Sequence, residues 1–157
     1  MGCGTGLSGL SLRNRCARLT GVDVSQGMLD QAQRREVYDE LRCLDLVAFL
    51  ARQDGQCDLL VATDVVMYLL ALKPFMWQCQ RVLKPGGILA FSTEKASEDE
   101  APEGWLERSS ERLAHCRSFI LSLAEGFELL KVKELDIRKD GTSKIRGDLF
   151  VFQRTPT

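Results

Sequence analysis

Short apolar runs alternate along this chain with amphipathic segments of helical period. The apolar runs, which we predict to be strands, cover residues 19–24, 41–44, 57–64 and 88–94. The predicted helices cover residues 7–15, 25–35, 72–83 and 106–125, with a short one between the second and third strands that buries Val47, Phe49 and Leu50. This alternation indicates an α/β fold built on a parallel sheet.

The end of the chain departs from this alternation. Two further predicted strands, residues 127–138 and 145–154, are separated only by residues 139–144. A parallel neighbour needs a crossover connection of a dozen or more residues, so these two strands must pair antiparallel. The sequence therefore predicts a mostly parallel sheet with a C-terminal antiparallel hairpin.

Length and composition limit the possible functions. A chain of 157 residues predicts a single domain, residues 1–157. Its 21 basic and 22 acidic residues give a formal charge of −1, so we expect a small-molecule substrate and neither a nucleic acid nor a membrane surface. Six scattered cysteines and one histidine indicate a cytoplasmic protein with no metal site.

The chain begins with alternating glycines, Gly2, Gly4 and Gly6. A turn without bulky side chains lets the backbone pass close beneath a ligand, and the helix that follows turns its first N–H groups towards that ligand. Three acids, Asp23, Asp45 and Asp64, each lie at the end of one of the predicted strands. Because ligands bind beyond the carboxyl ends of parallel strands, we expect these acids and the glycine turn to line one crevice.

With these features, the sequence resembles the class I S-adenosylmethionine-dependent methyltransferases. The matching segments are GCGTG at 2–6, LTGVDVS at 19–25 with MLDQA after it, LD at 44–45, CDLLVATDVVMYL at 57–69 and VLKPGGILAFSTE at 82–94. The resemblance implies a Rossmann-like, doubly wound fold with S-adenosyl-L-methionine as cofactor. More narrowly, the chain is similar to small-molecule methyltransferases associated with tetratricopeptide repeats, through YDEL-x-x-x-DL at 38–46 and a histidine, His115, in the helix after the strand 88–94.

The resemblance also implies roles for individual residues around the cofactor. The glycines at 2, 4 and 6 would approach its carboxypropyl end, and Asp23 would accept hydrogen bonds from both ribose hydroxyls. Thr63 and Asp64 would lie near the methionine portion and its sulfonium. The adenine would be held by Val24, Met28, Asp45 and Leu46.

Catalysis by such an enzyme consists mainly of placing the acceptor atom in line with the methyl group. A base is required only where the acceptor carries a proton. His115 and Tyr68 are the candidates, although a half-buried structural histidine explains His115 equally well. Trp105 and the acidic segment 95–104 form either a lid over the acceptor or a solvated loop. The acceptor and its reacting atom are not specified by these residues.

In the family, a central strand enters the glycine turn, and here its position falls before Met1. We therefore expect an unfilled central position in the sheet, which a homo-oligomer or a partner could fill with a strand. Two alternatives follow. One is a non-catalytic or truncated methyltransferase-like protein. The other is an NAD(P)-binding oxidoreductase, because residues 4–9 also satisfy G-x-G-x-x-G.

Overall fold

The computed structural model describes residues 1–54, 57–140 and 143–156. Its internal contacts divide the chain into two compact units, Met1–Gln53 (unit 1) and Asp54–Thr157 (unit 2). The prediction of a single domain stays a prediction. No helix within the described residues is long and apolar enough to cross a bilayer.

Unit 1 is built around two parallel strands. β1 (Thr20–Asp23) pairs in parallel with β2 (Glu40–Cys43), so that Thr20 lies opposite Glu40 and Asp23 opposite Cys43. The helices are α1 (Leu7–Leu12), extended by a 3-10 turn at Arg13–Arg15, then α2 (Gln26–Gln33) and α3 (Leu46–Ala51). The buried apolar side chains of these strands and helices are Val22 on β1, Leu29 and Ala32 on α2, and Leu46 and Leu50 on α3.

The Tyr38 side chain packs against both α1 and β1 within unit 1. A Cβ atom placed on Gly9 of α1 would lie 2.4 Å from the Tyr38 ring, and one placed on Gly21 of β1 would lie 3.0 Å from it. The ring is therefore held between two glycines, which gives the first residue of the YDEL segment a structural role. Asp39, the next residue, accepts hydrogen bonds from Arg13 and from the backbone N–H of Leu19.

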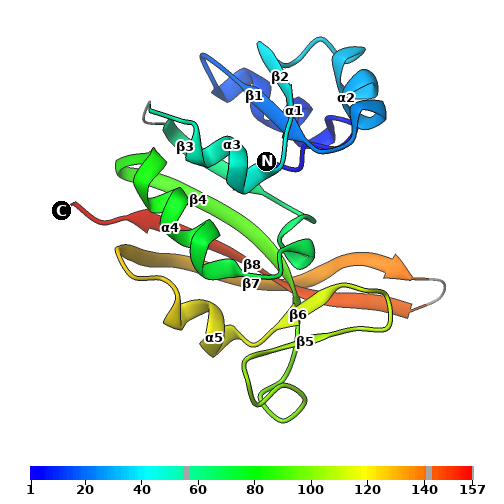
Figure 1. Cartoon of the computed structure of the whole chain (residues 1–157), viewed down its shortest axis with the longest axis vertical. Helices are drawn as coiled ribbons and strands as arrows, with labels where there is room; N and C mark the ends of the chain where they lie inside the picture. Colours follow the sequence, from blue (N-terminus) through cyan, green and yellow to red (C-terminus); the bar gives the residue numbers. More distant parts are fainter. Residues whose placement is uncertain (55–56, 141–142, 157) are drawn as a thin grey trace. The chain divides into compact units, whose positions relative to one another are not determined.

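Unit 2 is organised around one long strand, β4 (Leu83–Lys95), which Figure 1 shows passing behind α4 (Leu72–Val82). β3 (Cys57–Ala62) pairs with β4 in parallel, and β8 (Ser143–Arg154) pairs with it antiparallel. β8 also pairs antiparallel with β7 (Phe127–Asp140), which confirms the predicted hairpin. Residues 141–142, within the predicted connection, lie outside the described residues.

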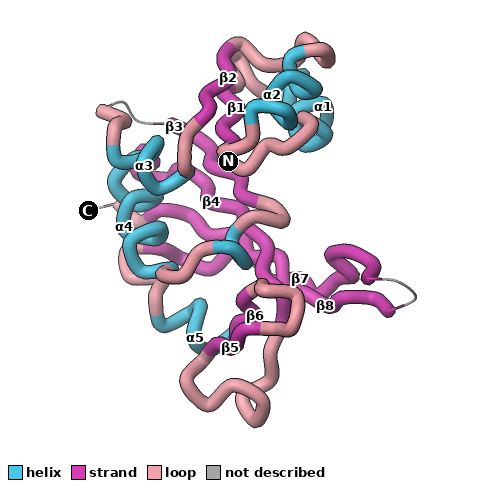
Figure 2. The backbone as a smooth tube through the Cα atoms, turned by 45° about the vertical axis from the view of Figure 1, so that its right-hand side comes forward, coloured by secondary structure: helices cyan, strands magenta, loops and turns pink. Residues whose placement is uncertain are grey.

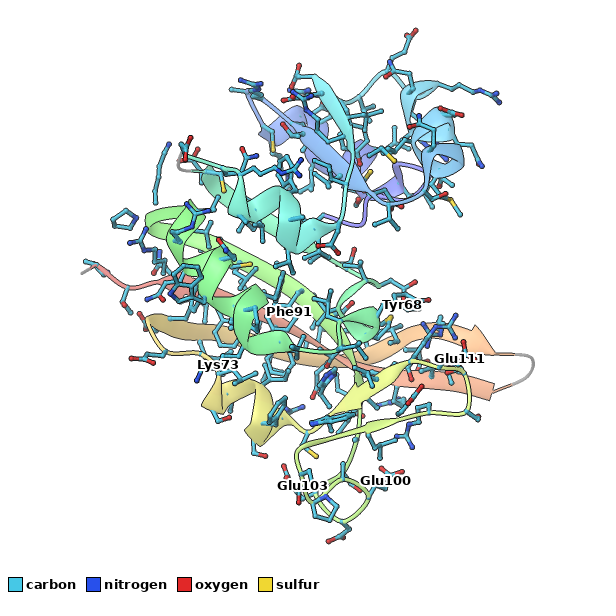
Figure 3. The ribbon with its side chains drawn as sticks, in the orientation of Figure 1. Tyr68, Lys73, Phe91, Glu100, Glu103 and Glu111 are labelled. Carbon is cyan, nitrogen blue, oxygen red and sulfur yellow. The ribbon has the colours of Figure 1, made fainter. Side chains whose placement is uncertain are left out.

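The core of unit 2 lies between α4 and this sheet. The predicted apolar stripe of α4 is confirmed, with Leu72, Phe75, Met76, Cys79 and Val82 buried. The ring of Phe75 packs edge-on against Phe91 of β4, with ring centroids 5.9 Å apart. Figure 3 labels Phe91 in the interior of unit 2. Phe91 also stacks with Phe150 and Phe152 of β8, so aromatic side chains from three elements fill the interior.

The predicted helix at 106–125 is wrong. The segment instead forms β5 (Trp105–Glu107), β6 (Leu113–His115) and a short helix, α5 (Arg117–Ser122). A tight turn joins the two strands: Arg108 donates its N–H to the Arg112 carbonyl, and Glu111 is left-handed at φ 59°. Because β4 extends far enough to pair in parallel with β6, a tertiary ladder replaces the local helical pattern. His115 therefore ends a strand rather than lying on a helix.

The described strands form two sheets, β1–β2 and a mixed sheet of β3 to β8. The α/β class and the Rossmann-like arrangement are confirmed, and the extra antiparallel pair, β5–β6, was not predicted. Figure 2 shows the far ends of β7 and β8 projecting from the rest of unit 2 as a two-stranded ribbon. Within the described residues, β1 forms a ladder with β2 in unit 1, and β3 forms one with β4 in unit 2.

Candidate functional site: a glycine turn in unit 1 and an apolar pocket in unit 2

The glycine turn has the backbone conformation that its composition predicts. Gly2, Gly4 and Gly6 have φ angles of 60°, 51° and 88°, in the left-handed region that other residues rarely adopt. The N–H of Cys3, between the first two glycines, donates to the carbonyl of Val22 on β1 at 3.0 Å. A Cβ atom on Gly4 would meet nothing within 4 Å, so the backbone there is bare.

Asp23 fastens this turn to the end of β1. Its Oδ2 accepts the N–H of Gly4 at 2.8 Å, and its Oδ1 accepts the N–H of Ser25 at 2.9 Å. The carboxylate and the turn therefore lie at the same end of the strand, as the sequence predicts. Since each carboxylate oxygen accepts about two hydrogen bonds, each can also accept one from a ligand.

Asp45 occupies the corresponding position after β2. Its Oδ1 accepts the N–H groups of Val47 and Ala48, both at 2.9 Å, so it is the N-cap of α3. The strand ends are joined because the N–H of Leu44 donates to the Asp23 carbonyl at 3.0 Å. Asp45 Oδ2 has no partner among the described residues, which leaves it available as an acceptor.

Exposed apolar side chains accompany these carboxylates in unit 1. Val24, directly after Asp23, is 70% exposed, and Met28 on α2 is 43% exposed. Leu46 differs, because its side chain is buried and only its backbone is able to meet a ligand. The four residues that the sequence predicts around the adenine thus offer a ligand two exposed apolar side chains, one carboxylate and one backbone group.

The other predicted cofactor residues, Thr63 and Asp64, follow β3 in unit 2. Both are exposed, and Asp64 is left-handed at φ 56°. Its N–H donates to Ser92 Oγ at 2.9 Å. Its Oδ1 lies 3.2 Å from Nη1 of Arg138, on β7.

Arg138 joins this carboxylate to a second one that sequence reasoning missed. Its Nη2 pairs with Glu94, which is buried near the end of β4. Glu94 lies at the end of a predicted strand, as Asp23 and Asp64 do, so the same sequence pattern could have identified it as a candidate site residue. Nothing in the sequence around Arg138 marks it, because its partners come from two other strands.

Tyr68, the first candidate base, lies on the 3-10 turn Val66–Tyr68 (Figure 3). Its hydroxyl oxygen accepts a hydrogen bond from Arg112 Nε at 2.8 Å, and the guanidinium carbon lies 5.6 Å from the ring centroid. The side chain is 55% exposed. Tyr68 is therefore a solvent-accessible hydroxyl with a cationic neighbour.

His115, the second candidate, lines a pocket of about 290 Å³. The pocket lies within unit 2, between the beginning of α4, strands β5 and β6, and α5. Its lining is almost entirely apolar and does not include Tyr68. The lining residues are Leu70, Ala71, Leu72, Lys73, Trp105, Leu113, His115, Phe119 and Leu123.

Burial controls the chemistry of His115. Only 3% of the residue is exposed, and burial lowers its pKa to about 4, so the imidazole is neutral at pH 7. The ring stacks with Phe119, with centroids 6.1 Å apart and planes 9° apart. Nδ1 has no hydrogen-bond partner among the described residues. A neutral histidine of this kind binds a hydroxyl readily but is a weak proton acceptor.

The comparisons with known proteins agree with this arrangement. Residues 1–91, more than half of the chain, match the methyltransferase domain family. A malonyl-[acyl-carrier protein] O-methyltransferase from Serratia marcescens is 32% identical over 120 residues, which cover 76% of this chain and 46% of the relative. A ubiquinone biosynthesis O-methyltransferase from Coxiella burnetii is 29% identical over 97 residues, 59% of this chain and 41% of the relative.

The solved structures give the same fold. The N-methyltransferase NodS from Bradyrhizobium japonicum, in complex with S-adenosyl-L-homocysteine, superposes with a TM-score of 0.74 at 21% identity. The match covers 99% of this chain and 76% of NodS. The fold is thus that of the S-adenosylmethionine-dependent methyltransferases, and this chain belongs to the methyltransferase domain family. It spans less than half the length of the curated relatives that it matches.

Proposed function

We propose that this chain takes part in methyl transfer from S-adenosyl-L-methionine to a small-molecule acceptor. The observation that carries the proposal is the hydrogen bond from Gly4 N–H to Asp23, which holds a bare backbone turn beside a carboxylate at the end of a parallel strand. Such a pair suits a nucleoside with a charged tail, because the turn admits the tail and the carboxylate accepts the ribose hydroxyls. The family match supports the same cofactor.

Each residue of unit 1 then has a defined role. Gly2, Gly4 and Gly6 leave room for the carboxypropyl end, and Asp23 accepts the ribose hydroxyls through the capacity that Gly4 and Ser25 leave unused. Val24 and Met28 cover the adenine ring. Asp45 Oδ2 and the N–H of Leu46 meet its polar edge. The roles that the sequence implies for Thr63 and Asp64, near the methionine portion and its sulfonium, stay predictions.

The cofactor supplies an activated methyl group bound to a sulfonium sulfur. This chain's part is to position the acceptor and to help remove its proton where there is one. His115 orients a hydroxyl through its neutral ring, and Tyr68 offers an accessible hydroxyl beside Arg112.

Calorimetric titration with S-adenosyl-L-homocysteine tests the proposal. Replacing Asp23 with alanine removes charge-assisted hydrogen bonds, so we expect at least about tenfold weaker binding. Asp30→Ala is the matched control, because Asp30 is exposed on α2 and accepts a hydrogen bond from the Gln26 side chain. Met28→Ala gives a second test without touching the turn. Absence of binding to the unaltered chain, or equal affinity for Asp23→Ala, would overturn the proposal.

The same titration separates the alternatives. Binding of NADH without S-adenosyl-L-homocysteine would favour an NAD(P)-binding oxidoreductase. Binding of S-adenosyl-L-homocysteine without methyl transfer to any acceptor would favour a non-catalytic methyltransferase-like protein. The tetratricopeptide-associated group, a cytoplasmic location and a homo-oligomer or strand-supplying partner stay predictions. One observation supports the last of these: in the described residues β3 forms a ladder only with β4.

A further inference from the structure

We propose that the pocket of unit 2 binds a small aromatic compound that carries one hydroxyl and one anionic group. The inference rests on the proposed function in that we take this compound as the methyl acceptor. The pocket itself is defined without reference to a cofactor, by residues of α4, β5, β6 and α5 together with the chain just before α4.

The walls of the pocket select an apolar, flat ligand. Leu72 and Leu113 are buried at its base, while Leu70 and Trp105 are exposed at 91% and 44%. Exposed apolar side chains around a concave apolar surface mark a binding site. A volume of about 290 Å³ lies near the lower end of the roughly 300–1,000 Å³ of small-molecule sites. One ring with a short substituent therefore fits better than a long chain.

Aromatic side chains add to the preference for a ring. His115 and Phe119 lie nearly parallel, and Trp105 contributes a third aromatic side chain to the lining. Aromatic pairs in offset-stacked or edge-to-face contact are worth about 0.5–1.5 kcal/mol beyond the area that they bury, a factor of roughly 2–13 in affinity. A planar ligand gains from such contacts where a branched aliphatic one does not.

The hydroxyl follows from His115. Its Nδ1 is buried and has no partner in the described part of the chain, although the residue lines the pocket. Buried polar atoms are normally paired, so this nitrogen, on a residue that lines the pocket, favours a ligand group able to pair with it. A hydroxyl both donates and accepts, and it therefore suits either tautomer of the neutral ring.

The anion follows from Lys73. It is exposed at the beginning of α4, where Figure 3 labels it, and it lines the pocket. No ion pair joins it to another described residue. An unpaired ammonium beside an apolar pocket favours a ligand with a carboxylate. The ligand would place its ring among the aromatic side chains, its hydroxyl against His115 and its charge towards Lys73.

Fluorescence of Trp105 measures this binding directly. Replacing Trp77, 59% exposed on α4, with phenylalanine leaves Trp105 as the only tryptophan. In this background we use 3-(4-hydroxyphenyl)propanoate as the probe, with 3-phenylpropanoate and 4-ethylphenol as analogues lacking the hydroxyl and the anion. We expect saturable binding of the probe and about fivefold weaker binding of each analogue, as for one lost hydrogen bond or exposed ion pair.

Lys73→Met should weaken the probe about fivefold and leave 4-ethylphenol unchanged. The control is Lys131→Met, because Lys131 is exposed on β7 and does not line the pocket. Equal affinity of the probe and both analogues, or no saturation, would overturn the inference. If S-adenosyl-L-homocysteine still binds in an Asp23-dependent way, the proposed function survives that result. Saturable, Lys73-dependent binding of the probe without S-adenosyl-L-homocysteine binding would overturn the proposed function and keep the pocket.

Discussion

The two units hold their carboxylates in different ways. In unit 1, Asp23 and Asp45 are held by backbone N–H groups, most of them two or three residues further along the chain. In unit 2, Asp64 and Glu94 are held by the Arg138 side chain, which is 74 residues from Asp64. Asp148, buried on β8, likewise accepts hydrogen bonds from Nε and Nη2 of the Arg117 side chain. Backbone donors follow from a local turn, whereas side-chain donors depend on how distant strands pack.

The sites proposed in each unit differ in the same way. The glycine turn is one short segment that is hydrogen-bonded to one strand, and a ligand there would contact backbone atoms. The pocket is assembled from three separated segments, 70–73, 105–115 and 119–123, and it presents side chains. Substitution of single side chains should therefore affect unit 2 more than unit 1, unless the substitution places atoms where the unit 1 backbone packs closely.

The largest effect is expected at Arg138. Its side chain is 17% exposed and that of Glu94 is 4% exposed, so Arg138→Met leaves a buried carboxylate without its cation. Breaking such a pair costs about 3–5 kcal/mol of unfolding free energy, which urea denaturation measures. Lys84→Met is the control, because the exposed pair of Lys84 with Asp58 is worth about 1 kcal/mol or less.

The double variant Glu94→Met with Arg138→Met sharpens the test. With both charges removed, most of the lost stability should return, since an apolar pair of similar size replaces a buried ion pair at little cost. A loss below about 1 kcal/mol for Arg138→Met alone would show that the side-chain network matters no more than a surface pair.

The next effect concerns pH and the pocket. The pKa of His115 is about 4 in the folded chain because of burial, against about 6.5 when it is solvated. The unfolded chain therefore binds the proton more tightly, and stability falls as pH drops from about 6.5 to about 4. The full difference amounts to about 3 kcal/mol by pH 4.

His115→Gln isolates this contribution, because glutamine is polar but does not titrate. Urea unfolding of both chains from pH 7 to pH 4 should show the unaltered chain losing more stability than the variant. Carboxylates contribute to both curves alike and cancel in the difference; the pKa of Glu134, for example, is about 2, lowered first by its hydrogen bond from Lys95. Parallel curves would mean that His115 is solvated in the folded chain, contrary to its burial.

A third prediction targets the close packing of unit 1. Gly9→Ala places a methyl group 2.4 Å from the Tyr38 ring, which cannot retreat because Gly21 lies on its other side. We expect a loss of about 1–3 kcal/mol, as for overpacking elsewhere. Gly27→Ala is the matched control in α2, where the methyl group meets nothing within 4 Å. That variant should gain about 0.5–1 kcal/mol, and equal effects of the two would contradict the packing of Tyr38.

The sequence predicts features that depend on neighbouring residues better than features that depend on the pairing of distant strands. The helix predicted at 25–35 corresponds to α2, where Ser25 is the N-cap and its side chain accepts the N–H of Met28. The strand before Asp23 and the apolar stripe of α4 were also predicted closely, because capping and periodicity are local. β5 and β6 were missed because they exist through pairing with β4, for which the segment itself carries no signal. The partnership of Arg138 with Glu94 was missed for the same reason.

The apolar spacing around His115 predicts which residues are buried but not their secondary structure. In the helix predicted at 106–125, the helical period puts Leu113, Cys116, Ile120 and Leu123 on one face, and the structure buries the first three. The spacing identified which residues face inwards but not the conformation, because a strand followed by a helix turn satisfies it as well. His115 lies at the end of a strand instead of on a helix, and it lines the apolar pocket.

The smallest effect is expected from substitutions that test the backbone conformation of Asp64, which is left-handed like the glycine turn of unit 1. Asp64 has φ 56°, close to the 51° of Gly4, but it carries a side chain. We compare Asp64→Gly with Asp64→Ala, because both lose the contact with Arg138 and that loss cancels. Glycine should leave the chain more stable by about 1 kcal/mol, since a left-handed conformation costs alanine about that much. Urea unfolding measures the difference. If alanine were the more stable, the backbone after β3 would be extended, and the Asp64 carboxylate would not be held where the predicted sulfonium contact needs it.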